Sequence, residues 1–338
     1  MTEQRVLVVS PSWVGDMVMS QTLYSLLKEI NPDAQIDVIA PGASKPILSR
    51  MADVHQSVLF DVGHGELRLG YRSCFAKRLR SNHYDQAIVL PNSLKSALVP
   101  FLANIPVRTG YRGEMRYLLL NDVRRLDKTR LPRMIDRFMS LGLAPEEALP
   151  EFKPPELTID PGNQEDCLKR LGLDLSLPIL GLCPGAEFGD AKRWPEEKFA
   201  EVAKGAIDGG MQIWLFGSAA DRLITQKIVE RLPTSKQKNC RNLAGRTTLL
   251  DAIDLLNLCR QVISNDSGLM HIAAAVGCRT IVLYGSTSPE FTPPLTDKAS
   301  ILREEISCSP CFKRDCPFGH KNCLNLIEPG RVLAQLEI

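Results

Sequence analysis

A lone carboxylate follows the first apolar run of the sequence, in the stretch "VVSPSWVGDMVMSQTL" at positions 8–23. The turn contains Asp16 and one glycine but no histidine, cysteine or lysine, and a helical pattern follows at once. Loops that follow the strands of an open parallel sheet border its ligand site, which makes Asp16 a candidate for chemistry. Aspartate is also a frequent helix cap. Both interpretations of Asp16 stay open at this point.

A second candidate site lies in "VISNDSGLMHIAAAVG" at positions 262–277, between a buried strand and a helix. Asp266 or Ser267 can cap the helix, Gly268 lets a ligand approach the backbone, and His271 falls one turn further on. The free N–H groups and the dipole at a helix N-terminus favour phosphate. The same residues also form an ordinary helix start, so this stretch alone does not decide between the two.

Three further loops favour a nucleotide. "PGAEFGDAKRWP" brings Lys192 and Arg193 just after a strand, and "LFGSAADR" is a small-residue turn whose Asp221 can reach a ribose hydroxyl. "NLAGRTTL" offers backbone groups that could read a base. Together these loops suggest a nucleoside diphosphate lying across one domain, although Lys192 and Arg193 taken alone fit a solvated charge pair.

Competing nucleotide motifs are absent from the sequence. It contains neither G-x-G-x-x-G nor G-x-x-x-x-G-K-[ST]. It also lacks any Asp-x-Asp pair, so a metal ion that clamps a diphosphate is not indicated. Protein cations and helix ends would then have to balance the charge of a departing diphosphate.

The first half carries a basic stripe. Residues 108–137 include nine Lys or Arg against four Asp or Glu. An acidic partner or an anionic membrane surface would suit this stripe, and a solvated helix face is the alternative. "LPNSLKSALVPF" adds Asn92, Ser93 and Lys95 at another strand end.

Four cysteines cluster near the C-terminus in "CSPCFKRDCPFGHKNC": Cys308, Cys311, Cys316 and Cys323, with His320 among them. The first pair has the spacing of a zinc site, but the second lacks the short spacing of a zinc ribbon. Reduced cysteines that order a loop and an oxidation artefact are the alternatives. The other six cysteines are scattered and are expected to be buried thiols in a reducing compartment.

Strand-length apolar runs alternate with helical segments along all 338 residues, which predicts two α/β domains. The runs are "RVLVVS", "QIDVIAP", "SVLFDV", "DQAIVLP" and "VRTGY", then "PILGLCPG", "QIWLFG", "QVISND" and "TIVLYG". Because most are apolar on both faces, we expect two doubly wound parallel sheets, covered on both sides. Residues 144–162 are rich in proline and acid and are predicted to form the linker.

A formal charge of +2 gives no general reason for nucleic-acid binding. No apolar stretch reaches the length of a membrane span, and "MTEQRVLVVSPSW" leads into a strand without a signal segment. We therefore expect a cytoplasmic protein with no nucleic-acid partner.

The ordered blocks "SWVGDMVMSQ", "TGYRGEMRYLLLNDVR", "PGAEFGDAKRWP", "LFGSAADR", "RNLAGRTTL", "SNDSGLMHIAAA" and "YGSTSPEFTPPL" closely resemble the ninth glycosyltransferase family, the ADP-heptose:lipopolysaccharide heptosyltransferases. The resemblance extends from Arg5 to about Leu295. It departs from the family at Ser10, where glycine would be expected.

The resemblance implies a GT-B fold of two Rossmann-like domains facing a central cleft. Residues 1–155 would bind the acceptor, and residues 156–338, ending in a C-terminal helix, would bind ADP-heptose. The reaction would be inverting and metal-independent, with no cofactor, and would add the second heptose to the first on the lipopolysaccharide inner core. The acceptor, heptosyl-Kdo2-lipid A, carries carboxylates and phosphates, which would give the basic stripe a purpose. The enzyme would also contact the anionic cytoplasmic face of the inner membrane peripherally.

The resemblance also implies roles for individual residues. Asp16 would be the base that accepts the proton of the attacking hydroxyl. The donor would contact Lys192, Ser218, Asp221, Asn242, Leu243, Ala244, Gly245, Asp266, Ser267, Gly268, Leu269 and His271, and the acceptor Asn92, Lys95, Arg112 and Arg116. Ser218 and Asp221 would lie near the ribose, and Asn242 to Gly245 beside adenine. The cysteine cluster is not expected to be catalytic.

Two alternatives remain at this stage. One is the member of the family that uses the same donor on Kdo, although "SWVGDMVMSQ" and "GEMRYLLLND" fit it less well. The other is a nucleotide-sugar epimerase or a binding protein of similar fold. Product analysis separates them, because epimerisation leaves ADP attached to the sugar and needs no acceptor.

Overall fold

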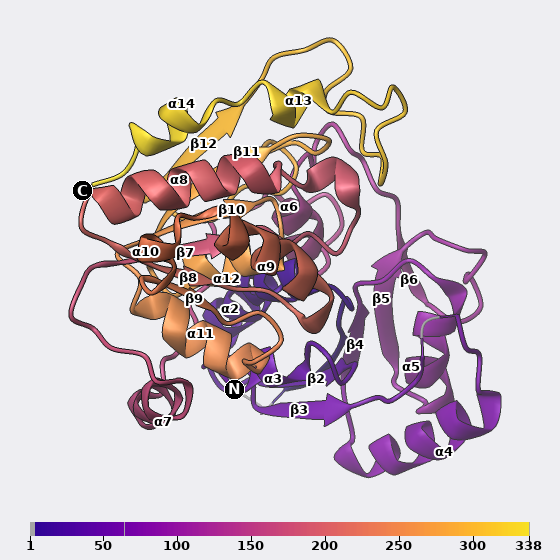
Figure 1. The fold of residues 1–338 in the computed structure, drawn as a ribbon. Coiled ribbons are helices and arrows are strands. Elements are labelled where there is room, and N and C mark those ends of the chain that lie inside the picture. The colour runs from indigo at the N-terminus through magenta and orange to yellow at the C-terminus, as the bar shows by residue number, and fades with distance from the viewer. Residues whose placement is uncertain (1–3, 64, 338) are drawn as a thin grey trace. The chain divides into compact units, whose positions relative to one another are not determined.

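The computed structural model describes residues 4–63 and 65–337. The chain forms two compact units, Met1–Pro155 and Glu156–Ile338, here called unit 1 and unit 2. Each contains its own sheet (Figure 1). Residues 144–160, most of the predicted linker, form no helix or strand.

Unit 1 contains a six-stranded parallel sheet in the order β3-β2-β1-β4-β5-β6. Its strands are β1 (Arg5–Val9), β2 (Gln35–Ala40), β3 (Gln56–Leu59), β4 (Gln86–Val89), β5 (Val107–Tyr111) and β6 (Asp122–Arg124). Its helices are α1 (Val14–Met19), α2 (Gln21–Ile30), α3 (Lys45–Leu48), α4 (Leu69–Leu79), α5 (Leu98–Leu102) and α6 (Met134–Met139), with short 3-10 turns η1 (Arg80–Asn82) and η2 (Leu94–Ala97).

Unit 2 repeats this arrangement with the order β12-β11-β10-β7-β8-β9, again all parallel. Its strands are β7 (Ile179–Cys183), β8 (Gln212–Leu215), β9 (Cys240–Asn242), β10 (Gln261–Asn265), β11 (Arg279–Tyr284) and β12 (Ala299–Arg303). Its helices are α7 (Pro161–Leu171), α8 (Glu196–Asp208), α9 (Arg222–Arg231), α10 (Thr234–Gln237), α11 (Leu249–Asn257), α12 (Gly268–Ala275), α13 (Asn322–Asn325) and α14 (Pro329–Leu333), with η3 (Asp190–Lys192) and η4 (Ala219–Asp221).

The side chains of β11 show how both faces of a sheet are buried. Ile281 and Leu283 join the core that α8 covers, whereas Val282 and Tyr284 pack with Met270 of α12. Because successive side chains of a strand point to opposite faces, α8 and α12 lie on opposite sides of the sheet. The prediction of two doubly wound parallel sheets is confirmed.

The strand order reverses at one place in each sheet, between β1 and β4 in unit 1 and between β7 and β10 in unit 2. At such a reversal the loops leave the carboxyl ends of the strands in opposite directions and open a ligand crevice. The loop after β1 leads into α1, whose first turn carries Asp16, and the segment after β4 carries Asn92 and Lys95. The loop after β7 carries Lys192, and the loop after β10 carries Asp266.

Candidate functional site

An ion pair lies at the strand reversal of unit 2. Lys192 Nζ is 2.6 Å from Asp266 Oδ2, and only 14% and 4% of these two side chains are exposed. The hydroxyl of Thr287, after β11, also donates to Asp266 Oδ2 at 2.5 Å. The helix-cap interpretation of Asp266 is wrong, because the N-cap residue of α12 is Ser267 and no side chain caps that helix.

Asn265 fixes the two loops that bring Lys192 and Asp266 together. Its side-chain Oδ1 accepts from the backbone N–H of Trp194 at 3.1 Å, and its Nδ2 donates to the Pro184 carbonyl at 2.8 Å. The side chain is fully buried, so these bonds form away from competing water. The sequence did not assign a role to Asn265 or to Thr287.

His271, predicted to bind the donor, is buried one turn into α12. Its pKa is lowered to about 4, chiefly by burial; Asp266 raises the pKa and Lys192 lowers it to a smaller extent. The imidazole is therefore neutral near pH 7 and can donate one hydrogen bond. Ser267, Gly268 and Leu269 in the first turn of α12 are partly exposed.

Asp221 has a structural role in the loop after β8. Its Oδ2 accepts from the backbone N–H and the hydroxyl of Ser218, at 2.9 and 2.8 Å, as in a capping box. A Cβ on Gly185 would lie 2.5 Å from the Asp221 carboxyl group, so the loop after β7 approaches it closely. The predicted ribose contact of Ser218 and Asp221 stays a prediction, and one carboxylate oxygen is already occupied.

The loop after β9 lies against the loop after β8. Gly245 donates from its backbone N–H to the Gly217 carbonyl at 3.1 Å and has φ of +68°, which favours glycine. Asn242 Oδ1 accepts from the N–H of Ala244 at 3.1 Å, which fixes the loop that also contains Leu243. The structure thus places the predicted donor loops along one edge of the sheet of unit 2.

Arg193, next to the paired lysine, has a polar atom without a partner. Its Nε is buried and forms no hydrogen bond with any residue that the structure describes. Its terminal nitrogen is 3.9 Å from Asp221 Oδ1, which is a long ion pair. A buried N–H without a partner costs free energy, so a ligand that accepts from it would be favoured here.

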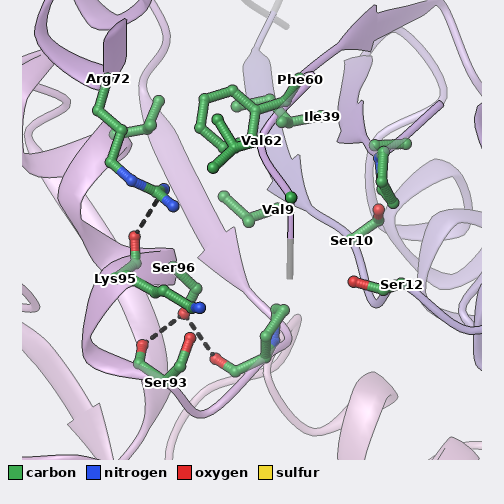
Figure 2. A pocket seen from close by; sticks show the side chains of 15 residues that line it. Val9, Ser10, Ser12, Ile39, Phe60, Val62, Arg72, Ser93, Lys95 and Ser96 are labelled. Atoms are coloured by element: carbon green, nitrogen blue, oxygen red, sulfur yellow. Dashed lines mark hydrogen bonds between the residues drawn. The ribbon is translucent and has the colours of Figure 1, made fainter. Parts of the chain in front are cut away.

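Unit 1 contains a pocket of about 130 Å³ at the carboxyl ends of its central strands (Figure 2). Lys95 supplies a cation to its wall and Phe60 an aromatic ring. The other lining residues are Val9, Ser10, Ser12, Ile39, Ala40, Pro41, Val62, Gly63, Arg72, Pro91, Ser93, Ser96 and Val99. Several hydroxyl groups beside a cation and an apolar wall suit an anionic sugar.

Asp16 lies in the first turn of α1 and is partly exposed. The N-cap residue is Trp13, whose side chain makes no capping hydrogen bond, so Asp16 is not the cap residue of this helix. A carboxylate in the first turn is still favoured by the helix dipole. Its predicted role as a base stays a prediction.

Most arginines of the basic stripe form hydrogen bonds or ion pairs with other residues of unit 1. Arg124 pairs with Asp122, and Arg133 with Asp136. Arg108 donates to two backbone carbonyls. Exposed positions in the stripe include Arg112, Arg125 and Lys128. Hydrogen bonds and ion pairs within unit 1 thus engage most guanidinium groups of the stripe, and its contact with an anionic partner or membrane stays a prediction.

Arg116 is the clearest correction. It was expected to contact the acceptor, but it is 1% exposed and its guanidinium donates to protein oxygens. Its partners are the carbonyls of Tyr111, Pro91 and Ser93, the Ser96 hydroxyl and the Asn92 amide oxygen. A side chain committed in this way cannot reach a ligand. Arg112 is exposed, and its contact with the acceptor stays a prediction.

The cysteine segment packs on the loop that carries Lys192. The Arg314 carbonyl accepts from the N–H of Ala191 at 2.9 Å, and Lys321 pairs with Asp190 at 2.9 Å. All ten cysteines are free thiols. Within residues 4–63 and 65–337, no three Cys, His, Asp or Glu side chains are grouped so as to hold a metal ion. The segment therefore supports η3 through backbone and ion-pair contacts.

The helices of residues 4–63 and 65–337 include none that is both long and apolar enough to cross a membrane.

Comparisons with known proteins agree with this geometry. Residues 72–322 match the profile of Glycosyltransferase family 9 (heptosyltransferase). The chain is 47% identical over 338 residues to lipopolysaccharide heptosyltransferase 2 of Escherichia coli, spanning 98% of this chain and 97% of that protein. It is 48% identical over 341 residues to lipooligosaccharide heptosyltransferase 2 of Haemophilus influenzae, spanning 98% of each. The solved structure of E. coli ADP-heptose lps heptosyltransferase II has a TM-score of 0.87 to this fold at 44% identity, covering 98% of this chain and 97% of that one. The chain therefore belongs to glycosyltransferase family 9, the heptosyltransferases.

Proposed function

We propose that this chain moves L-glycero-D-manno-heptose from ADP-heptose to the first heptose of the lipopolysaccharide inner core, which is the heptosyltransferase II activity. The near-full-length identity to heptosyltransferase 2 proteins supports this activity over transfer to Kdo and over epimerisation. The observation that carries the donor side is the Lys192–Asp266 pair, 2.6 Å apart at the strand reversal of unit 2. A cation at that place suits a diphosphate.

On the donor side, unit 2 would hold ADP-heptose. Lys192 and the partly exposed amides of Ser267 to Leu269 would stabilise the negative charge that develops on the leaving ADP. Neutral His271 would donate a hydrogen bond without adding charge. The buried Nε of Arg193 has no partner among the described residues, which supports a place for this guanidinium beside the phosphates.

On the acceptor side, unit 1 would hold the anionic inner core. The pocket with Lys95 and four serines supports this assignment, since ammonium and hydroxyl groups bind carboxylate and sugar oxygens. Asp16 would take the proton of the attacking hydroxyl while that oxygen bonds to the anomeric carbon. The bond between the anomeric carbon and the phosphate oxygen breaks in the same step, with its electrons passing to ADP. The configuration at that carbon is therefore inverted.

Assay of the purified protein with ADP-heptose and heptosyl-Kdo2-lipid A tests the activity directly. Mass spectrometry should detect free ADP and an acceptor heavier by one heptose. Kdo2-lipid A without heptose, used as a parallel substrate, should give no product. Transfer to Kdo2-lipid A alone would assign the first heptose step instead, and an altered sugar still joined to ADP would indicate epimerisation.

We also propose that unit 1 contacts the anionic cytoplasmic face of the inner membrane. Met115, Tyr117 and Leu118, between β5 and β6, are 83%, 53% and 88% exposed, and Arg112 in the same segment is exposed. Exposed apolar side chains next to a cation suit the interface of an anionic bilayer.

Sedimentation with phosphatidylglycerol vesicles tests this contact. Leu118→Ser should weaken vesicle binding, and vesicles of phosphatidylcholine should bind less. Leu223 of unit 2 is 69% exposed and provides the matched control, Leu223→Ser. Equal binding by Leu118→Ser, Leu223→Ser and the unaltered protein would exclude this segment as the contact.

A further inference from the structure

The loop after β4, residues 91–96, is fixed by a buried arginine from a different part of unit 1. Arg116 Nη1 donates to the Pro91 carbonyl at 2.5 Å and to the Ser96 hydroxyl at 3.1 Å. It also approaches the Ser93 carbonyl at 3.3 Å, and Nη2 approaches the Asn92 amide oxygen at 3.3 Å. One guanidinium therefore contacts four residues of a six-residue loop.

A charge at this depth is expensive for the fold. Arg116 is 1% exposed, and burial lowers its pKa to about 10, with Glu114 acting in the opposite direction. Its hydrogen-bond acceptors are uncharged oxygens, which offset the loss of hydration only in part. An apolar side chain could fill the same space at lower cost, but it could not hold four oxygens of the loop at fixed positions.

Two neighbouring contacts hold the loop in the same position. The carboxylate of Glu114 accepts from the backbone N–H of Leu94 at 2.9 Å, and the N–H of Glu114 donates to the Asn92 carbonyl at 3.2 Å. A Cβ on Gly113 would overlap that Asn92 carbonyl oxygen, so only glycine permits this close approach. The segment after β5 and the loop after β4 thus form one rigid assembly.

A second arginine holds the far end of the loop. Arg72 of α4 donates from Nη1 to the Lys95 carbonyl at 3.1 Å, and its guanidinium lies over the Phe60 ring at 4.9 Å (Figure 2). Lys95 lines the pocket, and no hydrogen bond or ion pair of its ammonium group is found among residues 4–63 and 65–337. The backbone of Lys95 is therefore fixed while its charge stays available to a ligand.

We infer that Arg116 is a positioning residue for acceptor binding: it sets the loop 91–96 so that Ser93 and Lys95 form the wall of the pocket for an anionic sugar. Arg116 does not touch the ligand and acts through the loop oxygens that it holds. This inference rests on the proposed function, which assigns the acceptor to unit 1.

Steady-state kinetics of Arg116→Lys, with each substrate varied in turn, test this role. Lysine keeps the charge but cannot reach four loop oxygens at once. The KM for heptosyl-Kdo2-lipid A should rise about tenfold or more, while the KM for ADP-heptose stays within about twofold. Arg108→Lys is the matched control, because Arg108 also donates to two carbonyls, of Leu119 and Ile105, but not to the loop 91–96.

A purely structural role for Arg116 predicts a different pattern. Both variants would then lose stability in denaturant and keep the acceptor KM of the unaltered protein, which would overturn the inference. If the unaltered protein produces no extended acceptor, the proposed function fails instead. The two failures are therefore distinguishable.

Gly113→Ala provides a second test that leaves Arg116 in place and decides the matter if Arg116→Lys does not fold. The added methyl must displace the Asn92 carbonyl, so the acceptor KM should rise while the donor KM stays constant. Gly70→Ala is the control, since a Cβ there meets no atom within 4 Å. An unchanged acceptor KM in folded Gly113→Ala would overturn the inference.

Discussion

Removal of the Lys192 charge should destabilise unit 2 and weaken ADP binding, and these two effects can be separated. In Lys192→Met the carboxylate of Asp266, which is 4% exposed, loses a partner at 2.6 Å and keeps the Thr287 hydroxyl. Breaking a buried ion pair from one side costs roughly 3 to 5 kcal/mol. Because the hydroxyl still donates and Lys192 is partly exposed, we expect the lower end, about 3 kcal/mol.

The double variant Lys192→Met/Asp266→Asn separates pairing from donor binding. Asparagine removes the buried negative charge that Lys192→Met leaves without a cation, and its side-chain oxygen can still accept from the Thr287 hydroxyl. The double variant should therefore recover most of the unfolding free energy that Lys192→Met loses. ADP affinity should return only in part, because Asp266→Asn removes a repelling carboxylate but does not replace the charged contact to phosphate, which is worth roughly 1.5 to 3 kcal/mol or about 10- to 150-fold in affinity. Chemical denaturation measures the first quantity and titration calorimetry with ADP the second.

Lys198→Met is the matched control for this pair of variants. Lys198 is 18% exposed and donates to the carbonyls of Asn325 and Ile327, so its loss should reduce stability without changing ADP affinity. Two results would refute the reasoning. One is wild-type ADP affinity in the double variant, which would mean that Lys192 pairs with Asp266 and does not bind ADP. The other is unchanged stability in Lys192→Met.

Four further predictions concern the remaining groups. Asp16→Asn should reduce kcat by roughly 10²- to 10⁴-fold with ADP affinity retained, and turnover close to the original value would mean that another group accepts the proton. Activity should survive EDTA, because the sequence has no Asp-x-Asp pair; loss of product that added Mg²⁺ restores would contradict this. Arg112→Ala should raise the KM for the acceptor and leave the KM for ADP-heptose unchanged, and a change in the donor constant alone would contradict the assignment of Arg112. Burial lowers the pKa of His271 from 6.5 to about 4, so between these pH values the unfolded chain binds a proton that the folded protein does not. The free energy of unfolding should therefore fall as the pH is lowered from about 6.5 to about 4. The loss should reach roughly 2 kcal/mol near pH 5, and His271→Asn should remove that part of the difference in unfolding free energy between pH 7 and pH 5.

The central strands of both sheets could be predicted from the sequence, because strands buried on both faces consist mainly of apolar residues. The five residues of β7 and of β10 are all buried, and they fall in the apolar runs "PILGLCPG" and "QVISND". The strands β6, β9 and β12 were not predicted. All three lie at sheet edges and are only partly buried. Their residues need not be apolar, so the sequence shows no hydrophobic pattern that would indicate a strand.

The turns of unit 2 that were assigned to the donor could be located in the sequence, because glycine and small polar residues at strand ends have a specific physical cause; the assignment to the donor stays a prediction. Gly245, for example, has a positive φ and touches the loop after β8. The partners of these residues could not be predicted. Nothing in the local pattern indicates that Asp266 pairs with Lys192, 74 residues away in the chain, or that Asn265 ties Trp194 to Pro184.

The hydrogen-bond partners of the basic stripe, residues 108–137, could not be predicted from the sequence either. A sequence shows the charge of an arginine but not its hydrogen-bond acceptors, and acceptors at the ends of parallel strands are plentiful because the last carbonyls of each strand leave the ladder. Arg116 binds such a carbonyl at Tyr111, the last residue of β5, whereas Arg108 binds the carbonyls of Ile105 and Leu119 in the segments that precede β5 and β6. Charge counting therefore does not tell which of these arginines are already bonded within the fold.

Charge balance also limits how a diphosphate can bind to unit 2. Lys192 already has an anion, Asp266, and neutral His271 adds no charge at pH 7. A diphosphate placed beside this pair would add negative charge to a buried carboxylate, which repels it unless further positive groups approach. Arg193 is the adjacent cation, and its ion pair with Asp221 is long at 3.9 Å. In the proposed donor complex, Lys192 would therefore be shared between Asp266 and phosphate, and Arg193 would supply the second positive charge.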